Sequence, residues 1–211
     1  MKARILVWLV ALFCCHNVLF AQKEFVNASA RLSGHPRILL QKGEEKALKK
    51  VIMKDAVWKD IHLSLVDEAG EIVKLPLNER IKTGRRLLSV SRENLRRIFI
   101  LSYAYRMKRA ESEMLKAASF SDWNPSHFLD VGEMTMALAI GYDWLYPQLS
   151  VQTKEAIEKA IVEKGLKPSF DERYNWFVNA VHNWSQVCHA GVTYGALAIW
   201  EKEPELSRTV I

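Results

Sequence analysis

Residues 125–147 read PSHFLDVGEMTMALAIGYDWLYP, and this stretch decides the fold class of the sequence. Apolar side chains recur in it every three or four positions, which is the spacing of one face of an α-helix. They are Phe128, Val131, Met134, Leu138 and Tyr142. Pro125 and Ser126 suit the start of a helix, and Pro147 ends it because proline cannot continue the hydrogen-bond ladder. The stretch therefore predicts one long helix packed in the core.

Similar helical patterns with short connections lie on both sides of this stretch. They cover residues 43–54, 56–68, 91–107, 110–118, 150–165 and 183–200, and a further helix begins at Pro204. No alternating run is long enough to predict a strand, so we expect an all-α chain of antiparallel helical hairpins. The helical spacing predicts a core that contains Leu95, Ile98, Phe99, Val131, Met134, Leu138, Ile157, Ile161, Leu197 and Ile199.

The first 21 residues have the pattern of a secretory signal peptide. A basic start with Lys2 and Arg4 precedes an apolar run too short for a membrane span, and Ala21 is a small residue suited to the cleavage site. We therefore expect cleavage before Gln22 and a periplasmic or secreted protein without a stable membrane span. Residues 22–34 are predicted to be a linker, and residues 35–211 a helical domain.

The composition excludes several classes of protein. The chain is 49% apolar and 26% charged, which is typical of a folded domain. Its net charge of +6 comes from scattered basic residues, so the charge pattern does not favour a nucleic-acid partner. The four lysines of residues 43–54 share their predicted helix with Glu44 and Glu45 and indicate a solvated face. They are Lys46, Lys49, Lys50 and Lys54.

Motifs for cofactors are not apparent in the sequence. A glycine-rich phosphate loop, a zinc-ligand spacing and a nucleophile elbow are all missing, so we expect no metal and no cofactor within this chain. After signal cleavage Cys188 is the one remaining cysteine. It lies in an apolar helix pattern and is expected to be a small buried residue rather than a nucleophile.

Three stretches rich in polar and aromatic residues interrupt the helical pattern, at residues 120–130, 141–146 and 174–191. Aromatic faces pack on the C–H faces of sugar rings, while amide, carboxylate and imidazole groups bind hydroxyls. Because the stretches fall at the ends of successive hairpins, they predict one groove.

Structural interpretations compete with a ligand site in each stretch. Tyr142, Trp144 and Tyr146 have the spacing of core and helix-end packing, and Asp143 between them suits a structural hydrogen-bond acceptor for a neighbouring helix. Asp122 or Ser126 is suited to cap the helix that follows, and His182 or Asn183 to cap the next long helix. A capping residue can also contact a ligand, because a helix start presents free N–H groups and a positive dipole.

Nearly all of the chain after the signal peptide resembles the N-terminal part of the heparinase II/III family of polysaccharide lyases. The resemblance rests on the order and spacing of several pieces rather than on one motif. They are residues 35–40 (HPRILL), 102–107 (SYAYRM), 122–130 (DWNPSHFLD), 139–146 (AIGYDWLY), 161–168 (IVEKGLKP), 183–188 (NWSQVC) and 196–206 (ALAIWEKEPEL). It implies an (α/α) toroid, incomplete at the C-terminus, that in the family precedes β-sandwich domains.

The resemblance also implies a reaction. Family members cleave glycans such as heparin, heparan sulfate or alginate by β-elimination at a uronic acid, which makes an anionic polysaccharide the expected partner. A lyase must neutralise the uronate carboxylate, remove the C5 proton and protonate the leaving oxygen. By resemblance, His182, Asn183 and Gln186 are the catalytic candidates that handle the carboxylate. The possible walls of the groove are Trp123, Asn124, His127, Trp176 and Trp184.

In the family, a Tyr and a second His complete the acid–base chemistry, and by resemblance both would lie beyond Ile211. We therefore expect residues 22–211 alone to be catalytically silent. Two other classes remain open. An (α/α) toroid glycoside hydrolase would need two carboxylates across a sugar, with Asp130, Glu133 and Asp143 as candidates. A helical protein that binds glycans without turnover is the other.

Overall fold

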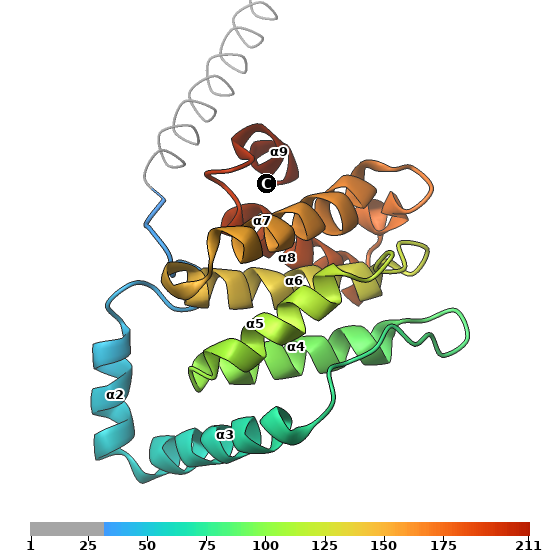
Figure 1. The fold of residues 1–211 in the computed structure, drawn as a ribbon. Coiled ribbons are helices and arrows are strands. Elements are labelled where there is room, and N and C mark those ends of the chain that lie inside the picture. The colour runs from blue at the N-terminus through green and yellow to red at the C-terminus, as the bar shows by residue number, and fades with distance from the viewer. Residues whose placement is uncertain (1–31) are drawn as a thin grey trace, which may run out of the picture. The chain divides into compact units, whose positions relative to one another are not determined.

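Residues 32–211 are described by the computed structural model of the chain (Figure 1). The predicted signal peptide, residues 1–21, lies outside the described residues. Residues 22–31, the first part of the predicted linker, also lie outside them. Residues 35–211 form one compact unit.

The described part of the chain is helical and contains no strand, as the periodicity predicted. The α-helices are α2 (Glu45–Lys54), α3 (Ala56–Lys74), α4 (Leu88–Tyr103), α5 (Met107–Ala118), α6 (Phe128–Leu145), α7 (Val151–Ala160), α8 (Asn183–Ala198) and α9 (Pro204–Val210). Shorter turns of helix are η1 (Tyr146–Gln148), the π-helical η2 (Ile161–Leu166), η3 (Lys167–Phe170) and η4 (Asn175–Asn179).

Helix α6 lies at the centre of the structure and packs most extensively against α4 and α8 (Figure 1). All of its residues except Met136 and Trp144 are buried. A helix that is apolar around its whole circumference needs neighbours on every side, which explains why residues 125–147 dominate the fold. The predicted core residues Val131, Met134 and Leu138 are fully buried in it.

Helices α4, α6 and α8 run parallel to one another in one layer. The start of α4 meets the start of α6, where the Leu87 N–H donates to Asp130, and their later turns meet where Phe99 packs against Trp144. Likewise, a side-chain carbon at Gly132 would touch Cys188, and one at Gly195, further along α8, would touch Thr135. Helices α5 and α7 return the chain between them and contact each other in a second layer.

Glycines allow the close approach of α6 and α8. A Cβ atom added at Gly191 would overlap the backbone of Gly132 on the facing helix, and one at Gly132 would lie 3.2 Å from the Cα atom of Cys188. Only glycine leaves room for two backbones this close, so this crossing fixes the spacing between the two helices that build the candidate site.

Two of the expected core positions are only partly buried, and one is wrong. Leu95 and Leu197 pack against the core from its edge. Phe99 is 38% exposed and lies on the Trp144 ring, with 5.2 Å between the ring centroids. The buried face of α4 is instead centred on Ile98 and Leu101, and it includes polar side chains such as Asn94 that an apolar count leaves out.

Several predicted helix boundaries move by a few residues, as is usual at helix ends. Helix α3 continues past Glu68 to Lys74, and α4 begins at Leu88 rather than at Ser91. The Ser150 hydroxyl accepts the Thr153 N–H at 3.1 Å, which confirms Ser150 as the N-cap of α7.

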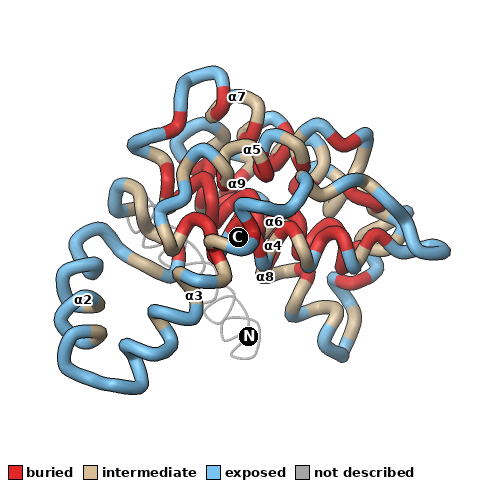
Figure 2. Tube along the Cα trace, turned by 60° about the horizontal axis from the view of Figure 1, so that its bottom comes forward, coloured by how far each residue is buried: buried red, intermediate tan, exposed pale blue. Residues whose placement is uncertain are grey.

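Helices α2 and α3 are the most exposed part of the domain (Figure 2). No residue of α2 is buried, and its four lysines are exposed, which confirms the predicted solvated face. Helix α3 buries only Ala69 and Ile72.

The end of α6 anchors the segment that leads into the domain. Asp143 is fully buried, and its carboxylate accepts the N–H groups of Arg37 and Ile38, both at 2.8 Å, and contacts His35 Nδ1 at 2.5 Å. Next to it, the Trp144 indole donates to the Ile38 carbonyl at 2.7 Å. The interpretation of Asp143 as a structural acceptor is thus confirmed, although its donors come from this segment rather than from a helix.

Replacing Asp143 by alanine is expected to lower the free energy of unfolding by about 2 to 3 kcal/mol, because the buried Ile38 N–H would lose its partner. Urea denaturation followed by circular dichroism measures this loss. Asp143→Asn is the control, since it keeps the shape and one acceptor oxygen and should lose less. Equal stability of Asp143→Ala and the wild type would contradict the anchoring role.

Candidate functional site

The starts of α6 and α8 lie at the same end of the parallel layer, and together they carry most of the predicted site residues. His127 precedes α6 and His182 precedes α8. The His127 ring meets the Trp184 ring edge to face, with 4.6 Å between the centroids. Two of the three polar and aromatic stretches, residues 120–130 and 174–191, are therefore joined at one place. The third, residues 141–146, lies at the opposite end of α6.

An aromatic surface extends from this contact. Trp184 packs against Trp176 with 4.8 Å between ring centroids, and Trp176 lies 6.0 Å from the His182 ring. Trp176 is 46% exposed, and Trp184 is partly exposed. Two neighbouring indoles that face solvent offer the flat apolar surface on which a sugar ring packs.

Beside this surface, His182, Asn183 and Gln186 are all exposed. His182 is the N-cap of α8, where its Nδ1 accepts the Trp184 N–H at 3.4 Å, so the capping interpretation is confirmed for His182. Asn183 and Gln186 lie in the first turn of the helix and form no side-chain hydrogen bond within residues 32–211. Their amide groups are therefore free to bind a ligand, in the positive field at the start of α8.

A buried carboxylate holds His127 in place. Asp130 is fully buried, and its Oδ1 lies 2.7 Å from His127 Nδ1. Its Oδ2 accepts the Leu87 N–H and the Asn124 side-chain amide, both at 2.6 Å. Because a carboxylate oxygen accepts hydrogen bonds, Nδ1 is the ring nitrogen through which His127 donates to Asp130.

Two of the proposed groove walls are part of the interior instead. Trp123 is fully buried, and its indole donates to the Ala117 carbonyl at 3.0 Å. Asn124 is 3% exposed and in the left-handed region, with φ of 59°, and its amide also donates to the Arg85 carbonyl at 2.8 Å. Neither side chain faces a ligand, whereas His127, Trp176 and Trp184 lie together at the surface next to His182.

Neither of the predicted side-chain caps of α6 is present. Asp122 accepts the Asn124 N–H at 2.7 Å and the Arg80 guanidinium at 2.6 Å, and no side chain caps the helix. Burial acts to raise the pKa of Asp122, but these hydrogen bonds outweigh it and hold the pKa below its usual range. Asp122 thus ties the connection between α3 and α4 to the start of the site.

A buried acid, Glu133, and a buried thiol, Cys188, lie close to His127 and Asp130. Burial raises the pKa of Glu133, although the Arg92 guanidinium, 3.1 Å away, opposes this. Burial, together with the charges of Glu133 and Asp130, raises the pKa of Cys188 to about 12. Cys188 is fully buried and keeps its proton at neutral pH, which agrees with its prediction as a small buried residue.

The three carboxylates suggested for a hydrolase do not form a pair across a sugar. Asp130 and Asp143 are separated by more than three turns of α6, or about 20 Å at 1.5 Å per residue. Both are fully buried and hydrogen-bonded, and Glu133 is paired with Arg92. Sequence reasoning missed that Asp130 acts on His127, although the spacing His-Phe-Leu-Asp at a helix start offers that signal.

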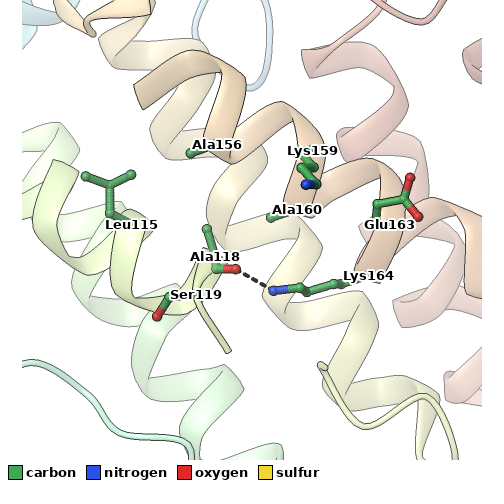
Figure 3. A pocket seen from close by; sticks show the side chains of 8 residues that line it. All are labelled: Leu115, Ala118, Ser119, Ala156, Lys159, Ala160, Glu163 and Lys164. Atoms are coloured by element: carbon green, nitrogen blue, oxygen red, sulfur yellow. Dashed lines mark hydrogen bonds between the residues drawn. The ribbon is translucent and has the colours of Figure 1, made fainter. Parts of the chain in front are cut away.

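A surface hollow between α5 and α7 lies away from these residues (Figure 3). Lys164 borders it and donates to the Ala118 and Phe120 carbonyls, which satisfies acceptors at the end of α5. Burial lowers the pKa of Lys164. Through these two bonds Lys164 joins η2, which follows α7, to the end of α5.

No protein-family model matches this chain, and a search of curated proteins finds no match to it. None of the helices within residues 32–211 combines the length and the apolar character needed to cross a membrane. Over the same residues, no three His, Cys, Asp or Glu side chains are grouped to hold a metal ion.

Proposed function

We propose that this chain carries part of the substrate groove of an exported polysaccharide lyase of the heparinase II/III type. Its substrate would be a uronic-acid-containing glycan such as heparin, heparan sulfate or alginate, cleaved by β-elimination. The observation that carries the proposal is the exposed set of His182, Asn183 and Gln186 beside the surface formed by Trp176 and Trp184.

The chemistry of elimination explains why this set suits a lyase. The C5 proton of a uronic acid becomes acidic enough to remove only when the charge of its carboxylate is neutralised. Amide donors and an imidazole next to a helix start can do this, because each supplies an N–H directed by the same positive dipole. The indoles would hold the sugar ring over these groups.

The layering of the helices supports the finer fold proposal, an (α/α) toroid. In such a fold, an inner layer of parallel helices alternates along the chain with an outer layer of returning helices. Here α4, α6 and α8 would be inner helices, while α5 and α7 would be outer ones. The site would then lie at the end of the inner layer where the helices begin.

The test uses the complete product of the gene, because elimination also needs the acid–base Tyr and second His that the resemblance implies. Asn183→Ala and His182→Ala are each expected to lower kcat/KM about 10²-fold, since each removes a contact to the developing charge. Formation of unsaturated uronate, followed by ultraviolet absorbance, measures the rate on heparin, heparan sulfate, hyaluronan, chondroitin and alginate.

Gln152→Ala is the matched control, because it removes an exposed amide from α7, away from the site. It should leave the rate unchanged. Full activity of both site variants would contradict the assignment of the site. Saturated reducing ends in place of unsaturated products would indicate a hydrolase, and binding without turnover would indicate a glycan-binding protein.

A further inference from the structure

His127 has one ring nitrogen engaged and one free. Its Nδ1 lies 2.7 Å from the Asp130 carboxylate, while its Nε2 makes no hydrogen bond within the described part of the chain. The side chain is 13% exposed and its ring contacts Trp184, so the free nitrogen borders the aromatic surface. In the neutral imidazole whose Nδ1 donates to Asp130, Nε2 carries a lone pair and is an acceptor.

The orientation of this acceptor is fixed by the interior. Asp130 cannot turn away, because the Leu87 N–H and the Asn124 amide hold its other oxygen, and it is fully buried. The edge-to-face contact with Trp184 holds the ring from the other side. A group held in this way loses little conformational entropy when it binds, which is what a specificity contact requires.

The groups around His127 determine which part of a ligand its Nε2 can bind. Asp130 and Glu133 face it from α6, Arg92 reaches Glu133 from α4, and α8 contributes Trp184 and the protonated Cys188. The start of α6, directly after His127, adds a positive dipole to these side-chain charges, so the lone pair of Nε2 is what separates the possible ligands. A sulfate oxygen has no hydrogen to donate to this lone pair, whereas a hydroxyl group donates a hydrogen bond to it.

We propose that His127, positioned by Asp130, accepts a hydrogen bond from a hydroxyl of the sugar that packs on Trp184, and so selects uronic acids without a sulfate at that hydroxyl. This inference rests on the proposed function of the site as a uronate-binding groove. Within the groove, His182, Asn183 and Gln186 would bind the uronate carboxylate. His127 would bind a hydroxyl of the sugar ring that carries no sulfate.

Two amide substitutions separate the roles of the two ring nitrogens. The amide of asparagine reaches the position of Nδ1 and can still donate to Asp130, but it leaves the place of Nε2 empty. The amide of glutamine reaches the position of Nε2 and restores an acceptor there. H127N therefore removes the proposed contact while it keeps the buried carboxylate paired, and H127Q is the conservative variant expected to rescue it.

Calorimetric titration measures the binding of two probes to the protein. One is an unsulfated tetrasaccharide of glucuronic acid and N-acetylglucosamine, and the other is its counterpart with 2-O-sulfated uronic acids. The wild type is expected to bind the unsulfated probe about tenfold more tightly, the value of one hydrogen bond of about 1.4 kcal/mol. H127N should bind both equally, and H127Q should recover most of the preference.

The ratio of the two affinities is the decisive readout, because a merely structural loss would weaken both probes alike. The inference is overturned if the wild type prefers the sulfated probe, if it binds neither probe, or if H127N keeps the tenfold preference. Elimination is followed separately by ultraviolet absorbance. A selective protein that forms no unsaturated product would overturn the lyase proposal alone, and an active enzyme without the preference would overturn this inference alone.

Discussion

Alanine in place of Gly191 is expected to lower the free energy of unfolding by about 3 kcal/mol or more, the upper part of the range for overpacked cores. The added methyl group would overlap the backbone of Gly132 on α6, and backbone cannot move aside as a flexible side chain can. Since α8 would have to shift as a whole, the surface formed by Trp176 and Trp184 should also lose its contact with His127.

Urea denaturation followed by circular dichroism measures the effect of Gly191→Ala. Gly70→Ala is the matched control, because Gly70 lies in helix α3 and a methyl group there would meet nothing within 4 Å. This control should gain about 0.5 to 1 kcal/mol from helix propensity. Equal stability of Gly191→Ala and Gly70→Ala would show that the backbones of α6 and α8 do not approach each other this closely.

The second large effect is expected at Glu113, the fully buried acid of helix α5. Its carboxylate accepts hydrogen bonds from Arg97 at 3.2 Å and from Arg109 at 2.7 Å, and both guanidiniums are mostly buried. Removing one partner from a buried ionic network leaves uncompensated charge, which typically costs about 3 to 5 kcal/mol. Glu113→Ala is therefore expected to lose stability of this size.

Thermal and urea unfolding measure the stability lost by Glu113→Ala, and two further variants serve as comparisons. Glu71→Ala breaks an exposed ion pair with Lys74 and should change stability by less than about 1 kcal/mol. Glu113→Gln keeps the shape and one acceptor and should fall between the two. A Glu113→Ala protein with wild-type stability would show that solvent reaches Arg97 and Arg109 after the change.

Local spacing predicted the helices, because the pattern of residues 125–147 is strong and the cap at Ser150 is a local signal. The error at Phe99 shows the limit of that approach. Helix α4 buries Arg97, whose partners include the Pro76 carbonyl and Glu113 from elsewhere in the chain, so its buried face cannot be found from apolar residues alone. Burial of such groups depends on tertiary hydrogen bonds that no local pattern encodes.

Only part of the candidate site was predicted from the sequence, because a local pattern does not show which polar side chains turn inward. The residues at the start of α8 were found because polar groups before an apolar helix are conspicuous in sequence. Trp123 and Asn124 share that composition but turn inward, since the backbone at Asn124 is in the left-handed region and its amide is bound to Asp130 and Arg85. Only the fold separates an amide that supports a site from one that faces its ligand.

The parallel layer of α4, α6 and α8 also bears on how the chain folds. Helix α6 packs on α4, as in the bond from Leu87 to Asp130 across 43 residues, and α8 packs on α6. Solenoid proteins share this neighbour-on-neighbour order, which lets folding start at one unit and extend to the next. Helices α4 to α6 are thus able to form a template before α8 has left the ribosome, and the contact between His127 and Trp184 forms only when α8 packs on it.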